Sequence, residues 1–313
     1  MTSFILNIDV EPVRRLVRGV PQDWDGFPEM VAFLQARRDR LSAVSGAQVK
    51  FNWNLRMDPQ IEHVYGDAGW VFDRYANEIK TVRASGDCIG LHVHTWRPGR
   101  RWFRGIWIAD YEDEDWIKHC LRLGLETYKA HLGDGPAVMS FGDGFMHGVA
   151  LPLMQEYGVR TDISMNPGVL AKSSVGKGET SKGMTPDYTK TPHLPFQPST
   201  EDFRVPGATN YSVWEIPVTT GRVKDVKGDG ESRTKLLFGM LTDRAAAIIS
   251  QALERKAPYV LAECRTDVLT NTDNRNRFIE ALAYVETLMT EGKLVPSTFD
   301  ALCEELDAKG QLA

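Results

Sequence analysis

The chain has 313 residues, of which 42% are hydrophobic and 25% charged, the balance of an ordinary globular protein. A net charge of -5 and a pI near 5.9 leave no broad basic surface, so nucleic acid is not an expected partner. No apolar run approaches the ~20 residues needed for a membrane span, and no secretory signal precedes the first apolar run. Four widely spaced cysteines without a CxxC pair fit a reducing compartment, so we expect a cytoplasmic protein.

Short apolar runs alternate with stretches of helical periodicity along the chain. Seven runs predict β-strands, at residues 3–9, 48–54, 88–93, 137–141, 159–164, 212–218 and 258–264. Near the end, Ser297 to Asp300 resembles a capping box that opens a last short helix. Strand-then-helix order predicts parallel strands with right-handed crossovers. Seven such units favour a closed or nearly closed α/β barrel, with sites at the carboxyl ends of the strands.

Residues 165–211 interrupt the alternation with six prolines, five glycines and no clear periodicity. A long irregular segment in a compact domain is usually functional or disordered. Because this one leaves from a strand end, a lid over the site and a disordered excursion fit it equally well. We expect a single domain over residues 1–313, with residues 165–211 as an insertion.

Two short motifs follow strand-like runs, Asp9-Val10-Glu11 and His92-Val93-His94. Residues at i and i+2 of an extended chain point to the same side, so each motif aims two polar side chains one way. Two carboxylates and two imidazoles that converge would make a hydrolytic metal centre.

The order and spacing of these motifs resemble the polysaccharide deacetylase (NodB-like) family. The similarity is carried by residues 6–12, 86–96, 140–145, 153–164 and 299–306. It covers residues 4 to 164 well and the remainder loosely. The resemblance implies a distorted seven-stranded (β/α) barrel, a divalent metal that is usually zinc, and hydrolysis of an N-acetyl or similar amide on a sugar.

The resemblance also implies roles for the motif residues. Asp9 stands at the position of the general base and Glu11 at that of a metal-binding acid, although the two could exchange roles. His92 matches the first metal histidine of the family. The second normally lies four residues further on, where this chain has Trp96, so His94 is the nearest replacement. Alternatively, His94 only forms hydrogen bonds at a strand end and His92 is the single imidazole ligand.

Asp143 lies in a glycine-flanked turn after the fourth predicted strand. We expect it to act in catalysis, by holding substrate hydroxyls or by orienting His92, with a turn-capping role as the simpler alternative. The family usually carries an arginine near this motif, where this chain has Ser140. The family also often has a late histidine that acts as general acid. This chain has no histidine there, and Arg265 or Asp267 is the nearest candidate for the role.

Trp96, Arg97 and Arg265 are the expected substrate contacts. A tryptophan at a strand end can stack on a sugar ring, although most tryptophans are simply buried. The basic stretch from Arg97 to Arg104, which we expect to be a loop, can recognise a phosphate or a nucleotide-sugar carrier, although a solvated positive face is the simpler explanation.

The expected function is therefore a metal-dependent hydrolase that removes an N-acetyl or similar acyl group from a sugar or a carrier-linked glycan precursor. An amidase acting on a small cyclic or linear amide is a second hypothesis. A catalytically silent barrel that only binds glycan is a third, because Val10, Trp96 and the missing late histidine depart from the family pattern.

Overall fold

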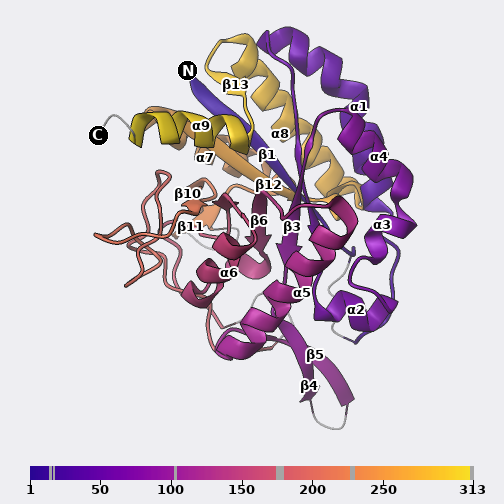
Figure 1. Cartoon of the computed structure of the whole chain (residues 1–313). Helices are drawn as coiled ribbons and strands as arrows, with labels where there is room; N and C mark the ends of the chain where they lie inside the picture. The colour runs from indigo at the N-terminus through magenta and orange to yellow at the C-terminus, as the bar shows by residue number, and fades with distance from the viewer. Residues whose placement is uncertain (14–15, 17, 102–103, 174–179, 226–229, 311–313) are drawn as a thin grey trace.

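The computed structural model describes residues 1–13, 16, 18–101, 104–173, 180–225 and 230–310. Its centre is a sheet of parallel strands in the order β12-β1-β2-β3-β6-β7-β9 (Figure 1). The strands are β1 (Thr2–Val10), β2 (Asn52–Arg56), β3 (Cys88–Val93), β6 (Val138–Phe141), β7 (Thr161–Asp162), β9 (Trp214–Glu215) and β12 (Tyr259–Arg265). A short strand, β13 (Leu294–Pro296), also pairs with β1. The seven predicted strands are confirmed, although β2 begins later than expected and β7 and β9 are shorter.

The two ends of this sheet are not joined by a strand ladder. Beyond β9, the Thr219 N–H donates to the Leu261 carbonyl of β12 at 3.2 Å, and residues 236–238 bridge to Glu263 of β12 through hydrogen bonds of 2.8 and 3.1 Å. The sheet therefore curls into a distorted, incompletely closed barrel, as predicted.

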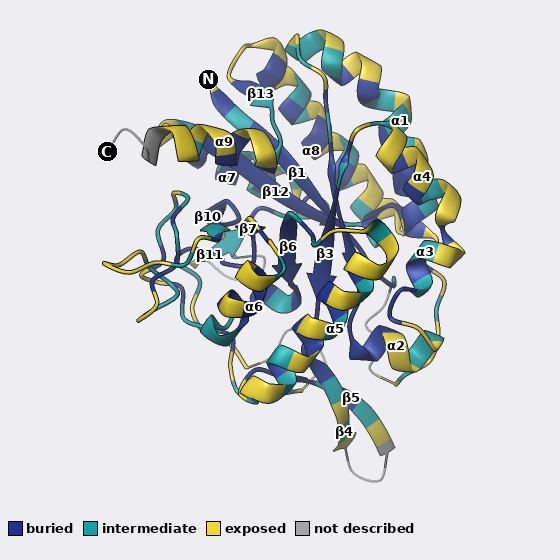
Figure 2. Cartoon of the chain, viewed as in Figure 1, coloured by how far each residue is buried: buried dark blue, intermediate teal, exposed yellow. Residues whose placement is uncertain are grey.

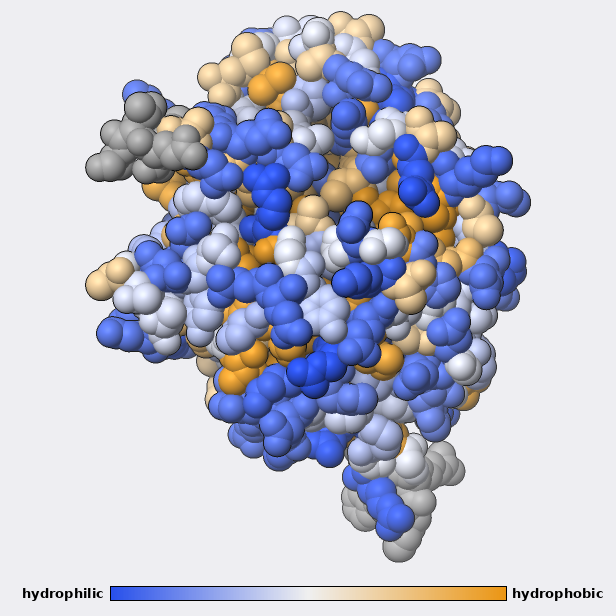
Figure 3. All heavy atoms as spheres, in the orientation of Figure 1, coloured by the Kyte–Doolittle hydropathy of each residue, from blue (hydrophilic) through white to orange (hydrophobic). Residues whose placement is uncertain are grey.

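Helices surround the sheet: those before the last described one pack their apolar faces on the outward-facing strand residues, and the last packs on residues of the barrel interior. They are α1 (Gly26–Ser45), α2 (Pro59–Tyr65), α3 (Trp70–Arg74), α4 (Ala76–Ala84), α5 (Glu114–Leu132), α6 (Leu151–Glu156), α7 (Thr242–Glu254), α8 (Thr272–Thr290) and α9 (Phe299–Gly310). In Figure 2 the strands of the central sheet are mostly buried, and the exposed residues lie on the outer sides of the helices, on loops and on the hairpins. On the face shown in Figure 3, hydrophilic residues predominate and hydrophobic ones form separate patches. No described helix is both long and apolar enough to cross a membrane.

The barrel interior changes from apolar to polar along β1. Phe4 and Leu6 belong to the apolar cluster between sheet and helices, whereas Ile5 packs with Phe299 of α9 in a second cluster. This two-residue period places alternate side chains on the two sides of the strand. Helix α9 thus closes the amino end of the interior, and the polar residues that follow Ile5 on the inner side reach the carboxyl end, at Asp9.

The basic stretch after the histidines is a hairpin, not the expected loop. β4 (Trp96–Arg101) pairs antiparallel with β5 (Arg104–Asp110), and the hairpin projects from the barrel in Figure 1. Trp107 and Ala109 are buried whereas Ile106 and Ile108 are more exposed, which is the two-residue period of a strand. Residues 102–103, including Trp102, lie outside the described residues.

The described part of residues 165–211 is irregular, as predicted, except for β8 (Ser181–Lys182), which pairs with β5. It packs against the edge of the sheet. Tyr188 and Phe196 are buried, and Phe196 exchanges two backbone hydrogen bonds with Glu215 on β9, at 2.8 and 3.1 Å. The segment therefore covers this edge of the barrel, where no helix lies among the described residues.

Candidate active site

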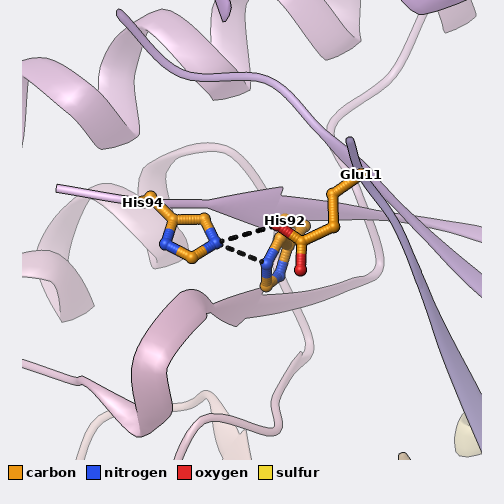
Figure 4. Close-up of side chains that lie close together, drawn as sticks. All are labelled: Glu11, His92 and His94. Carbon is orange, nitrogen blue, oxygen red and sulfur yellow. Dashed lines mark hydrogen bonds and ion pairs between the residues drawn. The ribbon is translucent and has the colours of Figure 1, made fainter. Parts of the chain in front are cut away.

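The two motifs meet at the carboxyl ends of β1 and β3 (Figure 4). The His94 Nε2 atom lies 3.1 Å from His92 Nε2 and 3.4 Å from Glu11 Oε2. All three side chains are buried, and their potential ligand atoms lie within 4.8 Å of one another. The structure thus brings together the three residues that the sequence predicted as metal ligands.

Both imidazoles direct Nε2 into this shared space because their Nδ1 atoms have partners outside it. Ser140 Oγ lies 2.8 Å from His92 Nδ1, and Asp143 Oδ2 lies 3.3 Å from His94 Nδ1. Outer partners of this kind fix the ring orientation of metal-binding histidines. A Cβ atom at Gly142 would lie 2.0 Å from His94 Cε1, so glycine at this position makes room for the ring.

Asp143 is held behind His94 by three donors. Its Oδ2 atom is also within hydrogen-bond distance of Trp96 Nε1, at 3.0 Å, and of the Tyr111 hydroxyl, at 3.2 Å. Its backbone has a left-handed φ of 65°, an unusual conformation for a residue other than glycine and one that often marks a functional position. The sequence left two catalytic roles open for Asp143, holding substrate hydroxyls or orienting His92; in the structure its carboxylate contacts His94 and not His92.

Glu11 lies between two guanidinium groups. Arg56 Nη1 is 3.3 Å from Glu11 Oε2, and Arg265 Nε is 3.1 Å from Glu11 Oε1. Burial alone would raise the pKa of Glu11, but Arg265 and His94 outweigh it and hold that pKa well below its usual range. Glu11 is therefore ionised, which is the form that binds a metal.

Asp9 lies beside His92, with Oδ1 3.7 Å from His92 Nδ1, and accepts a hydrogen bond from Asn7 Nδ2 at 3.0 Å. Burial and then the charge of Glu11 raise the pKa of Asp9 to about 7. Burial and then His94 lower the pKa of His92 to about 3, so this imidazole is neutral. An aspartate with a pKa near neutrality can both take up and release a proton.

These side chains line an open pocket whose other walls include residues that the sequence did not single out. Lys235 of β11 (Glu231–Lys235) forms an ion pair with Glu263 of β12, and both face the pocket, as does Lys172. Glu263 could have been found, since it lies two residues before Arg265 and therefore on the same side of β12. No spacing in the sequence connects Lys235 or Lys172 to the two motifs.

Two of the three expected substrate contacts do not line the pocket. Trp96 is 1% exposed and lies behind His94. Arg97 forms ion pairs with Asp110 at 2.9 Å and Asp113 at 2.8 Å. Arg265 does line the pocket, while also holding Glu11.

No family model and no curated protein matches the sequence, but solved structures match the fold. A candidate polysaccharide deacetylase from Mycobacterium smegmatis is 13% identical, with a TM-score of 0.54 over 99% of this chain and 91% of that one. A candidate glycoside hydrolase/deacetylase from Parabacteroides distasonis is 14% identical, with a TM-score of 0.55 over 94% and 68% of the two chains. The Puue allantoinase is 12% identical, with a TM-score of 0.51 over 98% and 90%.

The chain therefore has the NodB-like deacetylase fold, and the resemblance inferred from the motifs is confirmed at the level of the fold. At 12–14% identity the likeness defines the fold and leaves the activity to be argued from the site.

Proposed function

We propose that this protein is a metal-dependent hydrolase that removes an N-acetyl or similar acyl group from a sugar or a carrier-linked glycan precursor. The observation that carries the proposal is the cluster of Glu11, His92 and His94 beside Asp9, at the carboxyl ends of the barrel strands. The names of two structures with the same fold, a candidate deacetylase and a candidate glycoside hydrolase/deacetylase, agree with this chemistry.

The donor atoms of the cluster suit a divalent metal, and zinc in particular. Ligand atoms about 2.0–2.1 Å from a tetrahedral ion lie about 3.3–3.4 Å apart. The separations of 3.1 Å between the two Nε2 atoms and 3.4 Å from His94 to Glu11 are close to this spacing. Catalytic zinc sites commonly have three protein ligands and leave a position for water. A metal ion held by Glu11, His92 and His94 would lower the pKa of a bound water and polarise the amide carbonyl.

Asp9 is the proposed general base. Its carboxylate takes a proton from the attacking water and can return it to the departing amine, a double task that suits a pKa of about 7. Glu11 is less suited to this task because Arg56 and Arg265 stabilise its charged form. This electrostatic difference favours Asp9 as base and Glu11 as ligand over the reverse assignment.

Lys235 is the proposed hydrogen-bond donor to the reacting amide, in place of the late histidine that the family often has. Burial lowers the pKa of Lys235, but the Glu263 carboxylate outweighs this effect and raises it, so the ammonium keeps its charge. A charged donor at the pocket wall stabilises the negative charge that develops on the carbonyl oxygen. The sequence offered Arg265 or Asp267 for this role, but these two side chains contact each other at 3.1 Å and Arg265 also holds Glu11.

The same groups would hydrolyse a small amide that is not part of a sugar, and one structure with this fold is named an allantoinase. An assay of the zinc-loaded protein separates the two activities. Acetate release from N-acetyl sugars, free or linked to a nucleotide or lipid, supports the proposal if Asp9→Asn abolishes it. Ammonia release from small cyclic or linear amides, without acetate release, supports the amidase. If the metal-loaded protein releases neither acetate nor ammonia, both activities are ruled out and a barrel that only binds glycan remains.

A further inference from the structure

Three arginines gather outside the metal centre, on the hairpin of β10 (Thr220–Lys224) and β11 and at the end of α7. Arg222 lies directly opposite Arg233 in the antiparallel register of the hairpin, and Arg255 caps α7. Like charges directly opposite each other destabilise a strand pair. The next pair on the same face, Lys224 and Glu231, has opposite charges. The repulsion is therefore confined to the position of Arg222 and Arg233.

The guanidinium groups of Arg233 and Arg255 donate hydrogen bonds to neutral atoms. Arg233 Nη1 donates to His193 Nε2 and to Thr220 Oγ1, each at 3.4 Å. Arg255 Nη2 donates to the Thr220 carbonyl at 3.4 Å. Within the described ranges, none of the three arginines forms an ion pair with a carboxylate. Arg233 and Arg255 thus meet at Thr220, with Arg222 opposite Arg233, and none of the three has a negative partner among the described residues.

The cluster is electrostatically unfavourable without a ligand. Burial lowers the pKa of Arg233, and Arg222 and Arg255 lower it further. Burial also lowers the pKa of His193 to about 4, with Arg255 and Arg233 adding to the shift. His193 is consequently neutral, and a ring that accepts at Nε2 carries its proton on Nδ1. A bound anion would relieve the repulsion among the three guanidinium groups.

The cluster adjoins the catalytic pocket. Arg233 and Lys235 lie two residues apart on β11 and therefore share one face of the strand, about 7 Å apart at a rise of about 3.4 Å per residue. Lys235 lines the pocket. The backbone of residues 165–173 also connects the two places, because Gly168 packs against the Arg233 side chain and Lys172 lines the pocket.

We propose that Arg222, Arg233 and Arg255 form a binding site for a phosphate-type oxyanion beside the catalytic pocket. Guanidinium groups bind phosphate through paired, charge-assisted hydrogen bonds, and a bound oxyanion replaces repulsion between the opposed arginines with attraction. The phosphate group can belong to the substrate in the pocket or to a free ion.

Titration of inorganic phosphate into the full-length protein, followed by calorimetry, tests the site directly. We expect Arg222→Gln and Arg233→Gln each to weaken binding about tenfold. Arg83→Gln, which changes an exposed arginine on α4, is the matched control and should leave binding unchanged. In phosphate-free buffer Arg222→Gln should raise the thermal midpoint, because it removes a like-charge pair, whereas a merely structural arginine would lower it. Absence of phosphate binding to the unaltered protein, or equal loss in Arg83→Gln, overturns the proposal.

Turnover identifies the source of the phosphate group. If it belongs to the substrate, KM for an N-acetylated sugar phosphate is about tenfold below that of the unphosphorylated sugar, and Arg233→Gln removes the difference. If it is a free ion, inorganic phosphate changes the turnover of the unphosphorylated sugar. Both results support an oxyanion site. The site is measured by binding, so a failure of the proposed hydrolase activity leaves it standing.

Discussion

The Asp143 Oδ2 atom lies 3.3 Å from His94 Nδ1, and this contact determines which nitrogen of His94 faces Glu11 and His92. Asp143→Asn keeps the size of the side chain but removes its charge. We expect metal affinity to fall about 10- to 100-fold, the usual effect of losing an outer carboxylate partner. Competition with a chromophoric chelator measures this affinity. The control is Asp115→Asn, at a highly exposed position on α5. Unchanged affinity in Asp143→Asn would mean that His94 does not bind metal through Nε2.

Asp9→Asn separates the base from the ligands. Because the amide cannot accept the proton of the attacking water, turnover should fall at least about 100-fold. The bound metal should remain, since Glu11, His92 and His94 are unaltered. Steady-state kinetics and metal analysis of the same preparation give both quantities. Loss of metal in Asp9→Asn would show that Asp9 is a ligand and that the roles of Asp9 and Glu11 are exchanged.

Lys235→Met should lower kcat about 100-fold while leaving the metal content unchanged, because removal of a donor to a developing oxyanion costs about that much. The substitution leaves Glu263 buried without its cationic partner, so a second variant is needed. Lys235→Met combined with Glu263→Gln should fold as well as the unaltered protein and remain as slow as the single variant. Recovery of turnover in the double variant would contradict a catalytic role for Lys235.

Glu215 and Asp162 make a pH-dependent contribution to stability that is separate from the active site. They are paired residues on β9 and β7 and are fully buried. Burial, and then the charge of Asp162, raises the pKa of Glu215 well above its usual range. The folded protein thus binds a proton that the unfolded chain releases, so this contribution is present below the unfolded pKa of Glu215 and is lost as the pH rises toward the folded pKa.

Glu215→Gln imitates the protonated carboxyl group and should remove this dependence. Its oxygen can still accept the hydrogen bond from the Met165 N–H, which is 3.1 Å in the unaltered protein. The variant should therefore gain stability over the unaltered protein as the pH rises, by up to about 1.4 kcal/mol for each pH unit between the unfolded and folded pKa values. Urea unfolding of both proteins at about pH 5 and about pH 8 measures the difference in their free energies of unfolding. A difference that stays constant across this range would show that Glu215 is ionised in the fold.

The parts of the site that the sequence could predict are those within one strand. Asp9 and Glu11 share a side of one extended segment, as do His92 and His94, so local geometry was enough to group them. Ser140 was noted only as the residue in place of an arginine, because its contact with His92 depends on the register between β3 and β6. The Lys235 to Glu263 ion pair joins two strands of different sheets, and no local pattern encodes it.

The fold, like the site, could be predicted where it depends on local sequence patterns. The seven parallel strands follow from buried apolar runs, whereas the two hairpins do not follow from the alternation of strand and helix. The β4–β5 hairpin has four arginines among its strand residues, which favoured the interpretation as a solvated loop. The paired backbone and the burial of Trp107 and Ala109 outweigh that polarity.

The central claim is that Glu11, His92 and His94 bind a divalent metal, and metal analysis of the purified protein tests it most directly. After reconstitution with zinc, we predict close to one equivalent of metal per chain, lost in His92→Ala and in Glu11→Gln and retained in His119→Ala, at an exposed position on α5. Protein that binds no divalent metal after reconstitution, or that keeps its metal in both His92→Ala and Glu11→Gln, would contradict the account.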